Sequence, residues 1–100
     1  MKLKQNILEV ENLKLNTLEV EMKNTTLLII EGYDAFFMCG ALDVNIYKDR
    51  EVICGKAIKV KTIDELLHKP IFDCSDYAKI NGILPGMTVY EAFKKISQKK

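Results

Sequence analysis

The sequence predicts one α+β (or α/β) domain, with a mixed sheet of about five strands and three to four short helices. Apolar and polar residues alternate with a period of two in the first part of the chain, which is typical of strands with one buried face. Helix-start signals occur only in the second half. The length of 100 residues suits one domain, so we treat residues 1–100 as a single unit.

The composition excludes several classes of protein. Hydrophobic residues make up 48% of the chain, and 15 basic against 14 acidic residues leave a net charge of +1. The chain is too apolar for a disordered segment and not basic enough for a nucleic-acid binder that depends on bulk charge. No apolar run approaches the roughly 20 residues of a membrane span, and no signal-peptide core is present. We therefore expect a cytoplasmic protein with no membrane partner.

The alternating segment predicts an antiparallel meander. The apolar positions change face near Glu11-Asn12 and again near Asn16-Thr17. The first change suits a tight turn. The second suits a turn or a bulge, because one extra residue exchanges the two faces of a strand. The next turn is expected at residues 23–25.

Two continuously apolar segments follow, Thr26–Ile30 and Ala35–Cys39, with a turn between them. Continuous apolar runs are typical of central strands that are covered on both faces. A short helix is expected at Asp43–Arg50 and a strand at Glu51–Lys61. Because the helix joins two strands, this region predicts a compact βαβ unit with a parallel strand pair.

Three further short helices are expected. Thr62-Ile63-Asp64-Glu65 and Thr88-Val89-Tyr90-Glu91 are capping boxes, in which the Thr oxygen and the Glu carboxylate satisfy helix-start N–H groups. These boxes predict helices at Thr62–His68 and Thr88–Ser97. A third helix is expected at Cys74–Asn81.

Cys39 and Asp43 are the candidate catalytic residues. Cys39-Gly40 lies where a strand is expected to end before a helix, which is a favoured place for ligands in open α/β sheets. A thiol at a helix N-terminus also tends to have a lowered pKa. The alternative is that Cys39 is a packed core residue and that Asp43 caps the helix.

The candidate ligand-binding residues are Gly40, Cys54, Gly55 and Lys56. The two Cys-Gly pairs would be neighbours in a parallel sheet, and Lys56 alternates with Lys59 and Lys61 along the expected strand, where they could line an anion-binding face. The alternative is a core thiol beside a close-packing glycine, with the lysines on a solvated strand face.

Neither a metal nor a cofactor is expected. The odd number of cysteines suits reduced thiols in a cytoplasm better than disulfides. A metal site from the three cysteines and His68 lacks any C-x-x-C spacing, and His68 suits the last turn of a helix at the surface. Phosphate-loop and nucleophile-elbow motifs are absent from the sequence. These observations leave open whether the protein is an enzyme.

The run Met38-Cys39-Gly40-Ala41-Leu42-Asp43-Val44 resembles the YunC-like family of small bacterial and archaeal proteins, a domain of unknown function. The resemblance extends to Gly55-Lys56-Ala57, to Lys61–Leu67 and to Gly86-Met87. It implies a small α/β domain without an assigned activity, cofactor or substrate. Lys56 and Lys61 stand where the family has arginine, and Lys59 stands where it has glycine.

Two functions follow as hypotheses. The first is a homo-oligomeric binding or interaction module, because the short helices are too few to cover both faces of the sheet. The acidic early strands and the lysine-rich later segments could pair between subunits. The alternative is a small enzyme or ligand-binding protein with its site at the Cys39-Gly40-Asp43 corner. The sequence does not identify the small molecule.

Overall fold

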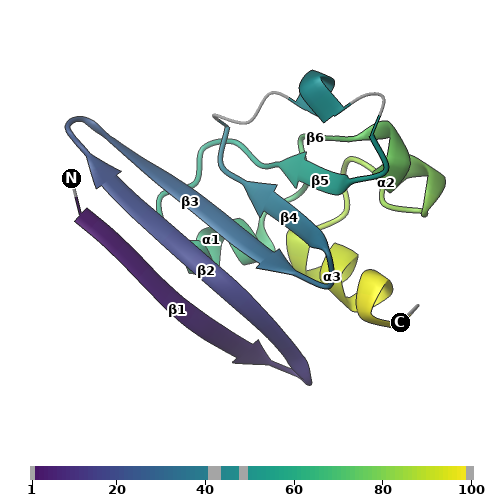
Figure 1. The fold of residues 1–100 in the computed structure, drawn as a ribbon, viewed down its shortest axis with the longest axis horizontal. Coiled ribbons are helices and arrows are strands. Elements are labelled where there is room, and N and C mark those ends of the chain that lie inside the picture. Colours follow the sequence, from purple (N-terminus) through teal and green to yellow (C-terminus); the bar gives the residue numbers. More distant parts are fainter. Residues whose placement is uncertain (1, 41–43, 48–49, 99–100) are drawn as a thin grey trace.

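The computed structural model describes residues 2–40, 44–47 and 50–98 of the chain. One six-stranded sheet has its strands in the order β1-β2-β3-β4-β5-β6, and the helices at residues 63–68 and 89–98 lie behind it (Figure 1). The strands are β1 (Lys2–Val10), β2 (Leu13–Met22), β3 (Thr25–Gly32), β4 (Ala35–Met38), β5 (Ile53–Lys56) and β6 (Asp73–Cys74). The helices are the 3₁₀ turn η1 (Val44–Tyr47), α1 (Ile63–His68), α2 (Asp76–Ile80) and α3 (Val89–Gln98).

The predicted α+β class is confirmed. Strands β1 to β4 pair antiparallel in sequence order, and β4 pairs with β5 in parallel. The sixth strand, β6, is only two residues long and pairs antiparallel with β5. The sequence therefore predicted the meander and the parallel pair, and missed this short edge strand. In the described residues, the crossover between β4 and β5 contains the 3₁₀ turn η1.

Two-residue turns close the hairpins of the meander. Glu11 and Asn12 have φ values of 44° and 70°, and Tyr33 and Asp34 have φ values of 53° and 62°. Positive φ at both central residues is the type I′ geometry, whose twist matches that of the flanking strands. The turn predicted at Glu11-Asn12 is confirmed.

The turn or bulge predicted near Asn16-Thr17 is wrong. Strand β2 runs without interruption from Leu13 to Met22 and keeps one register with both neighbours. Its first half buries Leu13 and Leu15 on the face that the helices cover, whereas Val20 is buried on the opposite face. The apolar pattern changes face because the surroundings change along one long strand.

The main core lies between the sheet and the helices α1 and α3. Helix α1 packs against β3 and α3, and α3 also reaches β2. Phe37 of β4 and Phe93 of α3 meet edge to face, with ring centroids 5.1 Å apart. Aromatic pairs in this arrangement stabilise a core beyond the area they bury.

The opposite face of the sheet is covered only in part. Near β4 and β5, the ring of Tyr47 in η1 packs edge to face on Phe36, and Cys54 is buried beside them. Over β1 and β2 the described residues provide no such cover, since Leu3 and Ile7 are each 59% exposed and Met22 is 43% exposed. The prediction that both apolar strands are covered on both faces therefore holds only beside η1.

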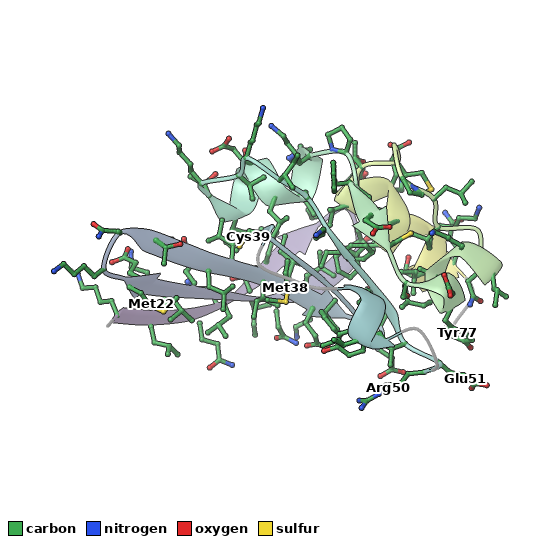
Figure 2. The ribbon with its side chains drawn as sticks, turned by 90° about the horizontal axis from the view of Figure 1, so that it is seen from above. Met22, Met38, Cys39, Arg50, Glu51 and Tyr77 are labelled. Carbon is green, nitrogen blue, oxygen red and sulfur yellow. The ribbon has the colours of Figure 1, made fainter. Side chains whose placement is uncertain are left out.

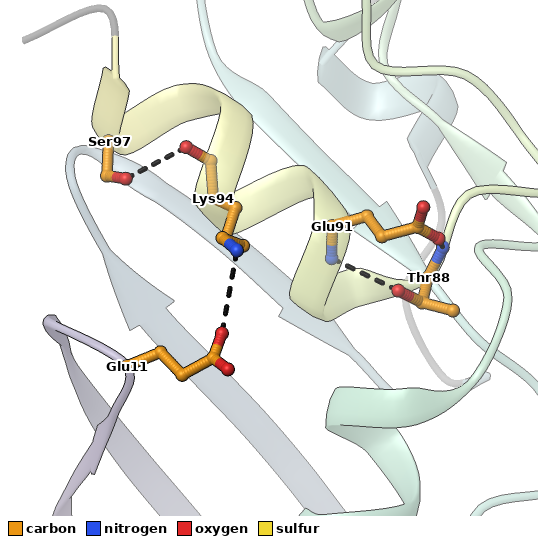
Figure 3. A network of polar contacts seen from close by, with 5 residues as sticks. All are labelled: Glu11, Thr88, Glu91, Lys94 and Ser97. Carbon is orange, nitrogen blue, oxygen red and sulfur yellow. Dashed lines mark hydrogen bonds and ion pairs between the residues drawn. The ribbon is translucent and has the colours of Figure 1, made fainter.

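Both predicted capping boxes are present. Thr62 Oγ1 accepts a hydrogen bond from the Glu65 N–H at 3.1 Å. Thr88 and Glu91 bond reciprocally, each at 3.0 Å, and Lys94 of the same helix lies 3.5 Å from Glu11 (Figure 3). None of the helices in the described ranges is long and apolar enough to span a membrane.

Three element boundaries differ from the prediction. The strand expected at Glu51–Lys61 ends at Lys56, and Lys59 adopts a left-handed φ of 61° beyond it. The helix expected at Cys74–Asn81 begins only at Asp76, because Cys74 belongs to β6 and Ser75 is the N-cap. Only η1 represents the helix expected at Asp43–Arg50, and Asp43 lies outside the described residues.

Candidate functional site

Cys39 lies at the carboxyl end of β4, as the sequence predicted. Its N–H donates to the Leu28 carbonyl at 3.1 Å and so extends the pairing of β4 with β3. Its Sγ donates to the Thr26 carbonyl at 3.8 Å. The side chain is 9% exposed and belongs to the main core. Cys39 is thus a core residue. Whether it also contacts a ligand depends on the space beside it at the end of β4.

A hollow of about 330 Å³ opens at this strand end. Figure 2 shows Cys39 and Met22 on the side of the molecule away from Tyr77. The lining comes from three segments that are distant in sequence: the β2–β3 hairpin, the end of β4 and the loop after β5. The lining residues are Met22, Thr25, Thr26, Leu27, Cys39, Gly40, Lys59 and Val60.

The lining of this hollow combines one positive charge with hydroxyl groups and apolar side chains. Among the described residues that line the hollow, only Lys59 is charged, and it is exposed. Thr25 and Thr26 supply hydroxyl groups, and Leu27 and Val60 supply half-buried apolar surface. None of the described lining residues carries a carboxylate, and Asp43 lies outside the described residues. This set of groups favours an anion over a cation.

The residues that the sequence predicted for a site lie in different parts of the structure. Cys39 and Gly40 line the hollow, whereas Asp43 is outside the described residues. Cys54 and Gly55 are buried elsewhere in the sheet, and neither lines the hollow. Lys56 places its Nζ 5.8 Å from the centre of the Phe72 ring, also away from the hollow. The predicted residues therefore do not form one site.

Cys54 and Cys74 are in environments that oppose a thiolate. Burial raises the pKa of the Cys54 thiol, and a hydrogen bond with Ser75 only partly offsets this effect. Burial likewise raises the pKa of Cys74, whose Sγ donates to the Ile83 carbonyl at 3.5 Å. Both residues act as small core side chains, because a neutral buried thiol is a poor nucleophile.

Sequence reasoning missed the hairpin side of the hollow. Thr25 and Thr26 occupy a predicted turn and strand start, and nothing in their local pattern indicates a site. The sequence predicts Lys59 on one strand with Lys56 and Lys61, whereas that strand ends at Lys56. Lys59 has a left-handed backbone instead, and it lines the hollow beside Gly40 and Val60. The pairing of β3 with β4 and of β4 with β5 brings these groups together.

A second cleft of about 300 Å³ lies near the amino ends of β4 and β5. Figure 2 places Glu51 and Tyr77 together there, far from Cys39. The lining residues are Tyr33, Asp34, Glu51, Ile53, Tyr77, Asn81 and Ile96. This cleft was not predicted, since its residues come from loops, strand β5 and the helices α2 and α3.

Within the described part of the chain, no three His, Cys, Asp or Glu side chains are arranged to hold a metal ion. His68 lies at the end of α1, where its side chain is exposed and its Nδ1 is 3.7 Å from Asp64 Oδ1. The three cysteines are all free.

Comparison with known proteins agrees with the resemblance noted in the sequence. The chain is 32% identical over 91 residues to the uncharacterized protein YunC of Bacillus subtilis (strain 168), covering 87% of this chain and 90% of that relative. The crystal structure of a protein of unknown function from Thermoplasma acidophilum, TA1206, has the same fold. Its TM-score is 0.86 at 24% identity, with 95% of this chain and 93% of that one covered. Residues 38–96 match the family described as a domain of unknown function, DUF1805, and the chain therefore belongs to this family.

Proposed function

We propose that this protein is a binding module that works as a homo-oligomer in the cytoplasm, and that two copies pair through strand β1. The observation that carries this proposal is that, in the part of the chain that the structure describes, β1 has no partner strand on its outer side. This strand is nine residues long and exposed along most of its length. A long edge strand that nothing covers is a ready template for pairing with another chain. The three free cysteines support a reducing compartment.

The direction of the backbone groups along β1 follows from the register. The Cys39 N–H bonds to the Leu28 carbonyl, so the even-numbered residues of β3 bond to β4. Residues along an antiparallel strand bond alternately to the neighbour on one side and to the neighbour on the other. Following this alternation from β3 through β2 shows that the even-numbered residues of β1 bond to β2. The N–H and C=O groups of Leu3, Gln5, Ile7 and Glu9 therefore point outward from the sheet.

Charge and apolarity along β1 favour a second copy as the partner. Lys2 and Lys4 lie near one end of β1, and Glu9 lies near the other. An antiparallel pair related by a two-fold axis places the basic end of each copy beside the acidic end of the other. The same arrangement partly covers Leu3 and Ile7, each 59% exposed in the single chain.

Proline at an outward position tests the proposal, because it removes an N–H that β2 does not use. We expect wild type and the matched control Gln5→Ala to have twice the 11.4 kDa chain mass by sedimentation equilibrium at micromolar concentration. Gln5→Pro should have the mass of a single chain with an unchanged circular dichroism spectrum. Leu3→Pro, nearer the end of the strand, serves the same purpose should Gln5→Pro unfold.

Two outcomes would overturn the proposal. One is a wild-type protein that remains a single chain at micromolar concentration. The other is a folded proline variant that still has twice the chain mass. Met22→Lys separates edge pairing from packing of the open sheet face, because Met22 lies on that face in β2 and not at the edge. Edge pairing predicts that Met22→Lys remains a dimer.

A further inference from the structure

The hollow at the carboxyl end of β4 has features of a ligand site that self-association does not explain. Its volume of about 330 Å³ is at the lower end of the range for small-molecule pockets. The carboxyl ends of parallel strands are also a favoured location for ligands in α/β sheets, and β4 is one of the parallel pair. The hollow thus suits a molecule of a few non-hydrogen atoms.

The charge of the ligand follows from Lys59. Among the described residues, no acidic side chain lies within 4.0 Å of the Lys59 ammonium to form an ion pair. Lys59 is also held in the left-handed region at φ 61°, which is uncommon for a residue with a Cβ. Such backbone positions cluster at ligand-binding sites. A single unpaired ammonium at the rim matches a ligand with one negative charge.

The remaining lining defines the rest of the ligand. Thr25 and Thr26 are exposed residues of the lining, and a threonine hydroxyl can donate to an anion. Leu27, Val60 and the Met22 side chain offer apolar surface for an aliphatic body. The Cys39 thiol donates to the Thr26 carbonyl, so it holds the hairpin against β4 rather than pairing with a charge.

We propose that this hollow binds a small aliphatic carboxylate, with Lys59 as the counter-ion and the hairpin threonines as hydrogen-bond donors. The carboxylate is favoured over phosphate because the site offers one point charge and no arginine fork. This binding is independent of pairing through β1, and different variants with different readouts test the two proposals.

Titration of the ¹⁵N-labelled protein with butyrate tests the proposal. We expect saturable changes in the amide shifts of Thr25, Thr26 and Gly40, and an affinity that falls as salt is added. Butyramide has the same shape without the charge and should produce no saturable change. Lys59→Gln should weaken butyrate binding by about fivefold, as expected for an exposed charge pair. Lys56→Gln, which changes a lysine outside the hollow, should leave binding unchanged.

Three results would overturn the proposal. The first is a set of shift changes that does not saturate or that spreads over the whole chain. The second is equal binding of butyrate and butyramide, or by wild type and a folded Lys59→Gln variant. The third is tighter binding of inorganic phosphate than of butyrate, which would assign the hollow to a different class of anion.

Discussion

The ring of Phe37 in β4 packs directly against Gly55 in the neighbouring strand β5. A Cβ atom at position 55 would lie 3.0 Å from Phe37 Cε1 and 3.0 Å from the Asp73 carbonyl oxygen. The ring also packs edge to face against Phe93 of α3. The missing side chain at Gly55 therefore makes the space in which the central aromatic residue of the core sits.

Gly55→Ala should lower the free energy of unfolding by about 1–3 kcal/mol, the usual cost of overpacking a core. One of the two crowded neighbours is backbone, which cannot move aside as a side chain would. Urea unfolding monitored by circular dichroism measures the effect. Gly40→Ala is the matched control, because its Cβ would meet only Ile58 Cγ2, at 3.4 Å. Equal stability of the two variants would contradict this account.

Ser75→Ala should cost about 2–3 kcal/mol, because one buried hydroxyl serves three partners. Ser75 Oγ donates to the Val52 carbonyl at 2.6 Å and accepts from the N–H groups of Cys54 and Ala78. The substitution removes the cap of α2 and leaves the Val52 carbonyl and the Cys54 N–H without this partner. In Ser97→Ala, the lost bond is exposed, and stability should change by less than about 0.5 kcal/mol. Similar losses in both variants would rule out this role for Ser75.

Lys59→Gly should stabilise the protein by up to about 1 kcal/mol, since glycine adopts a left-handed backbone without a steric penalty. The gain is limited because glycine also increases the entropy of the unfolded chain. Thermal unfolding of the variant should show a higher Tm than wild type. Lys56→Gly, in the extended strand β5, should show a lower one. A fall in Tm for Lys59→Gly would show that the lysine side chain contributes more than its backbone costs.

Glu91 should make stability depend on pH in the acidic range. The Thr88 N–H donates to the Glu91 carboxylate and lowers the pKa of this carboxyl group below its ordinary value. Its contribution is therefore complete above the unfolded pKa of about 4.3 and is lost as pH falls through the lower folded pKa. Tm measurements from pH 7 to pH 3 should show wild type above Glu91→Gln at neutral pH, with the difference closing in acid. A difference that is constant with pH would contradict this expectation.

The local features of the fold could be read from neighbouring residues. The capping boxes at Thr62 and Thr88 depend on bonds between residues three apart, and both helices begin where the boxes predict. The turn at Glu11-Asn12 likewise follows from the alternation on either side of it. By contrast, the alternation in β2 was misread near Thr17, because its change of face reflects packing by distant elements and not a turn.

In the candidate site, too, some features follow from local sequence and others depend on the tertiary structure. The sequence placed Cys39 and Gly40 at the end of a strand, because the apolar run and the following glycine are local signals. It could not pair them with Lys59, whose left-handed backbone is set by how the chain leaves β5, nor with Thr25 and Thr26 across the β3–β4 pairing.

By itself, the sequence determined the α+β class, the meander and the helix starts, because periodicity and capping act within a few residues. The tertiary structure alone decided which sheet face stays uncovered, that Gly55 serves packing against Phe37, and which loops surround the strand end at Cys39. These outcomes depend on contacts between residues far apart in the chain, and no local pattern contains them.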